Sequence, residues 1–209
     1  MTTLLTLKMN IFSIWEIQQS SEKGTRTVRI CAKDRPGLFS QIAGIFTLSN
    51  LDILDVQVFT WKNDIALDVF RVKPPADQIF ESEKWAQTAN RLQAVLSGKL
   101  DLDERLSEKM MTTRRRVPPP SKNAPKVRID NEGSSFYNIV EVIADDSPGL
   151  LYRVTHALYR CGLDLRTAII STRIDQVLDV FYVRDLQGQK IIDADQVRDI
   201  EAAVGSALS

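Results

Sequence analysis

The sequence has little cysteine and histidine, with two cysteines and a single histidine among 209 residues. One histidine cannot build a multi-histidine metal site, and His156 falls within a predicted helix, where we expect a surface or interface role. Cys31 and Cys161 occupy non-equivalent places in the two halves of the chain, so we expect buried, reduced thiols. No P-loop, Gly-x-Ser-x-Gly or Cys-x-x-Cys pattern occurs. We therefore expect no catalytic residue, no metal ligand and no cofactor.

The chain also lacks an excess of charge and a long apolar run. Its 27 basic and 27 acidic residues give a net charge of zero, which removes a general attraction to nucleic acid or to an acidic membrane. There is no run of about 18 apolar residues, and residues 1–10 lack the basic start and the cleavage site of a signal peptide. We expect a cytoplasmic protein with no nucleic-acid or membrane partner.

What the sequence does contain is a tandem repeat. Asp34-Arg35-Pro36-Gly37-Leu38 recurs as Asp146-Ser147-Pro148-Gly149-Leu150, at a constant offset of 112 residues. Each copy follows a β-rich run and precedes apolar residues with helical spacing. After the loss of one residue in a turn, Leu67-Asp68-Val69-Phe70 matches Leu178-Asp179-Val180-Phe181. The length suits two domains of about 100 residues each.

Each repeat is predicted to run strand, strand, helix, strand, strand, helix. This order gives a four-stranded antiparallel sheet with two helices on one face, a ferredoxin-like layout with the last strand moved to the front. The predicted class is α+β, with two such domains. We predict a flexible N-terminus at 1–10, domain 1 at 11–111, a basic proline-rich linker at 112–124 and domain 2 at 125–209. Arg114 to Arg116 could touch nucleic acid or an acidic partner domain, but a solvated linker is the simpler interpretation.

The repeated loop is the candidate ligand site. Proline presets a helix start, glycine lets a ligand approach the main chain, and the amides of the first helical turn favour a carboxylate. The aspartate can face an ammonium, so the loop matches both ends of a free α-amino acid. The alternative is structural, with the aspartate only capping the helix and the glycine only turning the chain. The candidate ligand-binding residues are Asp34, Arg35, Pro36, Gly37, Leu38, Asp146, Ser147, Pro148, Gly149 and Leu150.

These loops and their surroundings resemble ACT domains, regulatory modules that commonly bind amino acids between paired units. The span from about Ile11 to Leu208 resembles, more narrowly, the C-terminal tandem ACT region of the bifunctional uridylyltransferase and uridylyl-removing enzyme family. Besides the two loops, the resemblance is carried by Ile42-Ala43-Gly44, Leu67 to Phe70, Ile129-Asp130-Asn131 with Ser134, and Val180 to Val183 followed by Asp185, Gly188, Lys190 and Ile191.

The resemblance implies a regulatory region that senses glutamine and controls separate nucleotidyltransferase and His-Asp hydrolase domains acting on the PII nitrogen-signalling protein. It also implies pairing of ACT units, within one chain or across a homodimer. The sequence shows neither catalytic part, so we expect the chain itself not to be an enzyme. Two features depart from the family pattern. Ser147 replaces the arginine seen at Arg35, and Asp52 and Asp164 stand where ACT domains often have asparagine.

Two other functions stay open. The chain could be an interaction module that assembles through sheet edges or helices and binds no ligand. An enzyme would require chemistry whose residues we do not find. Asp68 and Asp179 recur inside strands, but strand alternation can place them on a polar sheet face or at an edge, so we assign them no catalytic role.

Overall fold

A computed structural model describes residues 4–9, 12–61, 64–75, 77, 79–113, 124–173 and 176–208. Nine antiparallel strands form one sheet in the order β1-β2-β3-β5-β4-β8-β9-β7-β6. The strands are β1 (Leu4–Met9), β2 (Ser13–Gln19), β3 (Arg26–Lys33), β4 (Ile53–Thr60), β5 (Ile65–Val72), β6 (Lys126–Asp130), β7 (Asn138–Asp145), β8 (Leu163–Arg173) and β9 (Gln176–Asp185). The helices are α1 (Leu38–Leu48), α2 (Glu81–Leu96), α3 (Leu102–Thr113), α4 (Leu150–Arg160) and α5 (Ala194–Ala207).

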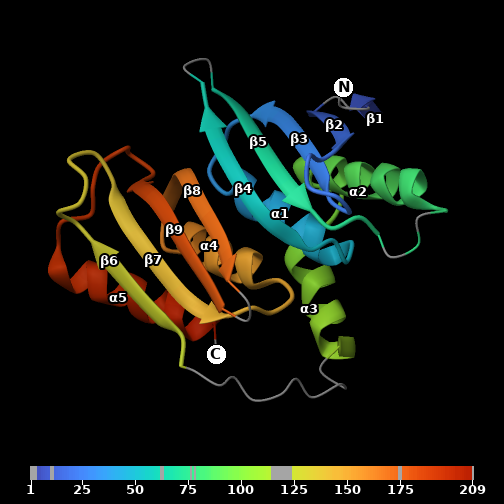
Figure 1. The fold of residues 1–209 in the computed structure, drawn as a ribbon. Coiled ribbons are helices and arrows are strands. Elements are labelled where there is room, and N and C mark those ends of the chain that lie inside the picture. The colour runs from blue at the N-terminus through green and yellow to red at the C-terminus, as the bar shows by residue number, and fades with distance from the viewer. Residues whose placement is uncertain are drawn as a thin grey trace.

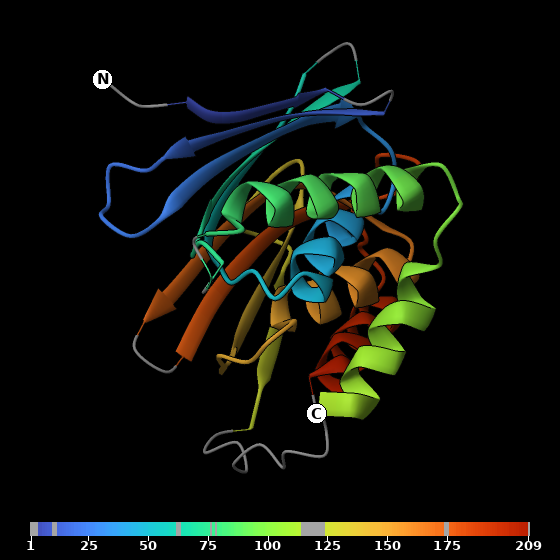
Figure 2. The same ribbon diagram turned by 90° about the vertical axis from the view of Figure 1, so that its right-hand side faces the viewer.

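The helices form a second layer on one face of the sheet (Figure 1). In Figure 2, turned by 90°, this helical layer lies beside the strands. The fold is α+β, with two ferredoxin-like units. The first unit contains β2 to β5 with α1 and α2, and the second contains β6 to β9 with α4 and α5. The two sheets join edge to edge where β4 pairs with β8, at Gln57 and Ile169. The two repeats therefore pair within one chain.

Strict alternation of buried and partly exposed residues along the strands builds the core. In β5 every second residue, including Phe70, is buried against the helices. The ring of Phe46 on α1 lies 4.9 Å from that of Phe70 and 5.8 Å from that of Trp15 on β2, both in edge-to-face geometry. Burial of each such ring contributes roughly 1.5–3 kcal/mol, so this cluster fixes α1 over the first sheet.

The units also pack through their helices, where a glycine allows close approach. A Cβ on Gly44 of α1 would lie 2.8 Å from ring atoms of Tyr152 on α4 and 2.8 Å from a methyl of Leu102 on α3. No side chain larger than hydrogen fits there without movement of its neighbours. Gly44 is thus the point where α1, α3 and α4 meet.

The N-terminus differs from the prediction. Residues 1–10 were expected to be loose, but Leu4–Met9 forms β1 and pairs antiparallel with β2. The strand satisfies backbone groups that β2 would otherwise leave at the sheet edge. The predicted linker begins later than expected, because α3 extends through Thr113. Residues 114–123, including Arg114 to Arg116, lie outside the described residues, and the domain boundaries stay a prediction.

Several smaller expectations can be compared with the structure. Asp193 caps α5 by accepting a hydrogen bond from the amide of Gln196, three residues further on. Cys31 and Cys161 are free thiols, as expected, but both are only half-buried. In the described part of the chain no helix has the length and apolar character to cross a membrane. Within the same residues no group of three His, Cys, Asp or Glu side chains is placed to hold a metal ion.

Candidate functional site

Both repeated loops start a helix in the same backbone geometry. Gly37 and Gly149 are the N-cap residues of α1 and α4, with φ of 81° and 78°, a left-handed conformation that favours glycine. Among the described residues no side chain caps either helix. The structural alternative for the aspartates, helix capping by Asp34 and Asp146, is therefore wrong. The first-turn amides of both helices keep no side-chain acceptor.

The space in front of each glycine is filled by the other unit. A Cβ on Gly37 would lie 3.1 Å from the ring of Tyr159 on α4, and a Cβ on Gly149 would lie 2.9 Å from the Cγ2 methyl of Thr47 on α1. The close approach that each glycine allows is therefore made by a neighbouring side chain. A ligand reaching the main chain at this point would have to displace that side chain.

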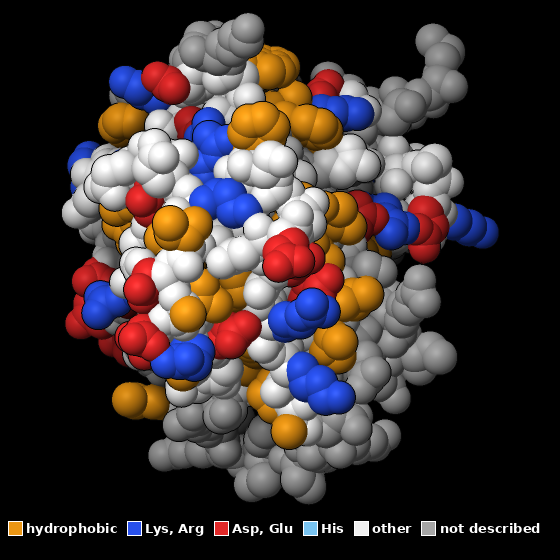
Figure 3. All heavy atoms as spheres, turned by 90° about the vertical axis from the view of Figure 1, so that its left-hand side faces the viewer, with side chains coloured by type: hydrophobic (Ala, Val, Ile, Leu, Met, Phe, Trp, Pro, Cys, Tyr) orange, Lys and Arg blue, Asp and Glu red, His pale blue; other side chains and the backbone are white. Residues whose placement is uncertain are grey.

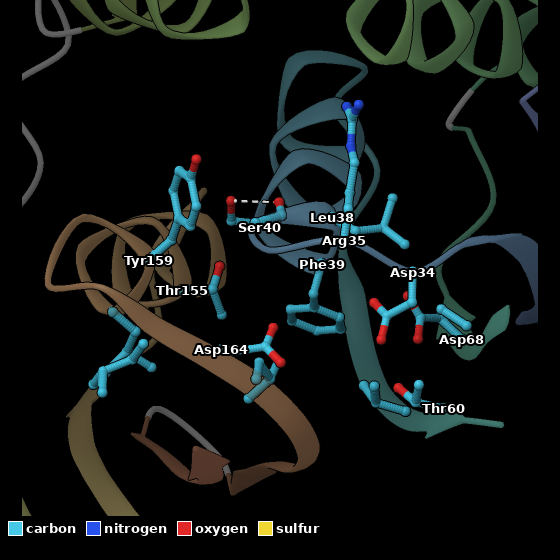
Figure 4. Close-up of a pocket in the computed structure, with 16 residues that line it drawn as sticks. Asp34, Arg35, Leu38, Phe39, Ser40, Thr60, Asp68, Thr155, Tyr159 and Asp164 are labelled. Atoms are coloured by element: carbon cyan, nitrogen blue, oxygen red, sulfur yellow. Dashed lines mark hydrogen bonds between the residues drawn. The ribbon is translucent and has the colours of Figure 1, made fainter. Parts of the chain in front are cut away.

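The first loop borders a cavity that the second unit completes (Figure 4). Val58 and Thr60 of β4, with Ala66 and Asp68 of β5, line it from the first unit. The lining from the second unit consists of Thr155, Leu158 and Tyr159 of α4 and Leu163, Asp164 and Leu165 at the start of β8. The cavity volume is about 20 Å³, so a ligand larger than a water molecule requires movement of the surrounding side chains. The site is thus an interface site built within one chain.

An arginine that the motif search did not single out bridges the two units here. Arg166 Nη1 lies 3.4 Å from Asp34 Oδ2 and 3.2 Å from Asp164 Oδ2. The register of β8 against β9 shifts between Leu165 and Thr167, so Arg166 occupies a bulge, a feature that can redirect a side chain. Burial raises the pKa of Asp164, and the charge of Asp34 adds to this rise while Arg166 opposes it.

Asp68 does not lie on a polar face or at a sheet edge, and that expectation is wrong. Its side chain points to the helical layer from the middle of the sheet, paired with Ile30 of β3 and Val58 of β4, and only 1% of it is exposed. Asp179 is equally buried in the second unit. Burial, together with the nearby charge of Asp34, raises the pKa of Asp68 to about 8. The buried Asp68 carboxyl is a part of the cavity that strand alternation concealed.

The other predicted residues of the first loop have different surroundings. Arg35 turns its guanidinium away from the carboxylates in Figure 4, donating 2.8 Å to Gln41 Oε1 and 3.4 Å to the carbonyl of Leu96. Pro36 is exposed in the turn, and Leu38 is buried and anchors α1 in the core. In this structure Asp34 is the loop side chain that pairs across the units, while Arg35, Pro36 and Leu38 shape the helix start.

The second loop lies in a different environment. Asp146 and Pro148 are exposed, and Ser147 Oγ accepts a hydrogen bond of 2.8 Å from Arg153 Nη2. Leu150 is buried in the core, like Leu38. The terminal methyl of Met110, on α3, lies near Gly149, 3.6 Å from where a Cβ would stand. The ten predicted residues therefore do not form one site or two equal ones.

Helix α3 is held beside the second loop by hydrogen bonds to the end of α1 and to α4. Lys109 Nζ donates to the carbonyl of Thr47 and, at 2.6 Å, to Asn50 Oδ1 at the end of α1. The hydroxyl of Tyr152 donates 2.6 Å to Asp103 Oδ1, and His156 Nε2 lies 3.7 Å from Asp103 Oδ2. His156 thus lies at a helix interface, as expected. Helix α3 follows α2 of the first unit, and the described residues of the second unit form β6 to β9 with α4 and α5.

Sequence reasoning missed the contribution of Arg166, Tyr159 and Thr155. One signal was available for Arg166. At the offset of 112 residues, Arg166 corresponds to Leu54 and Tyr159 to Thr47. These unequal pairs distinguish the partners of the two loops, although sequence alone does not place them opposite the loops.

Comparison with known proteins finds relatives that match most of the chain. The chain is 33% identical over 202 residues to a bifunctional uridylyltransferase/uridylyl-removing enzyme of Rhodospirillum rubrum, covering 93% of this chain and 21% of the enzyme. It is 38% identical over 188 residues to the enzyme of the same name from Azospirillum brasilense, covering 87% of this chain and 20% of the enzyme. The chain is similar to one part of these enzymes, in agreement with the resemblance of its tandem repeat to their tandem ACT region, and we call it the ACT-type module.

This ACT-type module spans about a fifth of the length of the curated relatives that it matches. No family model matches the chain. Among solved structures, an aspartate kinase from Synechocystis aligns over 86% of this chain and 26% of its own, with 17% identity and a TM-score of 0.45.

Proposed function

We propose that the ACT-type module binds a free α-amino acid, glutamine first, in the cavity between the first loop and the second unit. The observation that carries this proposal is the cavity itself, which Asp34 of the loop and Asp164 of the other unit both line, with Arg166 ion-paired to both carboxylates. An amino acid needs an acceptor for its ammonium and donors for its carboxylate. Both kinds of group border this cavity.

The two ends of the ligand can be matched to the two kinds of group. In the first turn of α1 the amide of Leu38 donates to the carbonyl of Arg35, whereas no side chain in the described structure caps the amides that follow, and a helix N-terminus favours a carboxylate. Asp34, with 17% of its side chain exposed, offers a partly desolvated acceptor for the ammonium. Such charge-assisted hydrogen bonds contribute about 1.5–3 kcal/mol each.

Arg166 occupies the position of a cation in the ligand-free protein. Its guanidinium already neutralises Asp34 and Asp164, so an incoming ammonium either displaces it or shares the carboxylates with it. If it is displaced, the guanidinium is free to meet the ligand carboxylate. Binding would thus rearrange a contact between residues of the two units, a local event that can be transmitted through their interface.

We further propose that occupancy of this site controls attached or partner catalytic domains that add and remove uridylyl groups, as the names of the relatives describe. The PII-type protein named by the resemblance would be the substrate of those domains. The module would contribute the amino-acid signal and no catalytic group. Changes at the β4–β8 and α1–α4 contacts offer the physical route, because both join the two units.

Calorimetric titration of the purified chain with glutamine tests the proposal, with glutamate and leucine as controls. Saturable heat with glutamine and a stoichiometry near one per chain is the expected result. Replacing Asp34 by alanine should abolish or strongly weaken that binding, whereas Asp146→Ala is the matched control. Absence of binding by any of the three amino acids would refute the proposed ligand class.

A second candidate function is protein interaction without a ligand. The sheet face opposite the helices is free of helices in the described structure (Figure 1), and Figure 3 shows the adjoining side of the molecule, where hydrophobic side chains are interspersed with charged ones. Large exposed apolar residues lie on five of its strands, namely Ile14, Phe59, Ile143, Ile169 and Leu178. An exposed apolar surface of this kind favours assembly with another protein surface. Light scattering across a range of protein concentrations would detect self-assembly through this face.

A further inference from the structure

Asp68 carries a carboxyl oxygen whose burial the fold alone does not explain. The side chain is 1% exposed, and within the described residues its Oδ1 atom has no hydrogen-bond partner. Its cross-strand neighbours are Ile30 and Val58, both buried and apolar. A buried carboxyl without a partner is costly, and an aliphatic side chain would suit these neighbours better.

The same carboxyl lines the ligand cavity beside Asp34. Asp34 and Asp68 both border that space, and Figure 4 shows their carboxyl groups directed to the same region. They lie near enough for the charge of Asp34 to add to the effect of burial on the pKa of Asp68. Two carboxyl groups so placed cannot both ionise in a low-dielectric site unless a cation joins them.

The guanidinium of Arg166 does not neutralise Asp68. Arg166 joins Asp34 to Asp164, and Oδ1 of Asp68 stays without a partner among the described residues. A metal ion does not suit the arrangement, because the described acidic side chains form no metal-holding group here. An ammonium suits it better, since its three N–H donors can reach acceptors on both carboxyl groups.

We propose that Asp34 and Asp68 together hold the ammonium of the ligand, and that ligand binding expels one proton from this carboxyl pair to solvent. This inference rests on the proposed function and names the chemistry of that site. The proton that leaves Asp68 is replaced by the ligand's ammonium charge, so the net charge of the carboxyl pair and the cation bound to it does not change. The site therefore selects ligands with a free amine, and its occupancy depends on pH as well as on ligand concentration.

The pH dependence has a defined direction. Below about pH 8 the Asp68 carboxyl is protonated in the free protein. Release of one proton on binding makes affinity rise about tenfold for each pH unit between roughly pH 5.5 and 7.5. The other titratable and charged groups that line the cavity are Asp34, Asp164, Arg35 and the phenol of Tyr159, and Arg166 is ion-paired to Asp34 and Asp164. The Asp68→Asn variant separates their contribution from that of Asp68.

The test is calorimetric titration of the full chain with glutamine at pH 7 in phosphate and in Tris, two buffers with different ionisation enthalpies. The difference in heat reports the number of protons released. We expect close to one proton for the unmodified chain and close to none for Asp68→Asn. Asp179→Asn, the matched change at the equivalent buried position, should keep the release. Glutaramic acid, which is glutamine without its amine, should bind at least tenfold more weakly and release no proton.

The outcomes separate the two proposals. If no amino acid binds the unmodified chain, the proposed function and this inference both fail. If glutamine binds without proton release, the function stands and the inference is overturned, a result that needs no variant to fold. An unchanged release in Asp68→Asn would also overturn the role of Asp68 while leaving the ligand site in place.

Discussion

The two Asp-x-Pro-Gly-Leu loops share backbone and differ in what surrounds them. Both begin a helix at a left-handed glycine and bury the following leucine. The first loop faces Tyr159, Asp164 and Arg166, and its aspartate is paired. The second faces Thr47 and α3, and its aspartate is exposed. The comparison teaches that the motif supplies a helix start, whereas the elements packed against it supply the site.

The largest expected effect separates the two aspartates. Asp34→Ala removes a carboxylate that the proposed site uses for the ligand's ammonium, so affinity for glutamine should fall roughly tenfold to a hundredfold. Asp146→Ala should change affinity less than about twofold, because that side chain is exposed outside the cavity. Titration of both variants measures the ratio. Equal losses would mean that both loops bind the ligand.

A second effect concerns the stability of the buried carboxyl. The folded-state pKa of Asp68 is about 8 against an ordinary value of 3.8, so the folded protein binds this proton more tightly than the unfolded chain. Its contribution to stability is complete below about pH 4 and is lost as the pH rises to about 8. Asp68→Asn removes this loss and should gain on the order of 5 kcal/mol at pH 8 relative to pH 4.

Urea unfolding of Asp68→Asn and of the unmodified chain, at several values between pH 4 and pH 8, measures that difference. A constant difference between the two proteins across this range would contradict the raised pKa. The ligand should be absent, because binding would itself stabilise the folded state.

Substitution of the two loop glycines, Gly37 and Gly149, should have a smaller effect. Both substitutions should lower stability, but only one should weaken ligand binding. Gly37→Ala and Gly149→Ala each force a Cβ into a left-handed residue and against a side chain of the other unit. Each should lower the free energy of unfolding by about 1–2 kcal/mol. Only Gly37→Ala should also weaken glutamine binding, since only Gly37 lines the cavity. Thermal unfolding followed by titration distinguishes the two readouts.

The smallest effect tests the attachment of α3, which makes the loops unequal. Tyr152→Phe removes the hydroxyl that donates to Asp103, and we expect a loss of about 1 kcal/mol. Tyr159→Phe is the control, because it keeps the ring that lies over Gly37 and should alter stability by less than about 0.5 kcal/mol. Denaturant midpoints of both variants give the comparison. A larger loss for Tyr159→Phe would show that its hydroxyl holds the unit interface.

Much of the fold could be predicted because short stretches of sequence in each repeat indicate its strands and helix starts. Strand β5, Ile65–Val72, contains the repeated stretch Leu67 to Phe70 and is followed by a Pro-Pro pair, and both features are visible in the sequence. The helix cap at Asp193 was likewise visible in its spacing to Gln196. The N-terminal strand β1 was missed, because a short edge strand depends on the neighbour that it pairs with.

The site was predicted only in part, for a physical reason that Asp68 and Arg166 illustrate. The alternation of side chains along β5 places Asp68 on the opposite face of the sheet from Leu67 and Val69. It does not determine which of the two faces α1 will cover. Arg166 reaches Asp34 across 132 residues of sequence, and a bulge at its own position accompanies the contact. No local pattern contains such a contact, because its partner enters only after the two units have packed.

The sequence by itself determined the repeat, the two ferredoxin-like units and the two helix starts, because each depends on spacing and backbone preferences along a short stretch. Only the tertiary structure decided that one loop has a cavity and the other a helix beside it. Edge pairing of β4 with β8 brings Asp164 and Arg166 to the first loop, and α3 packs beside the second. Both contacts join segments far apart in sequence, so their free energy appears only when the units meet.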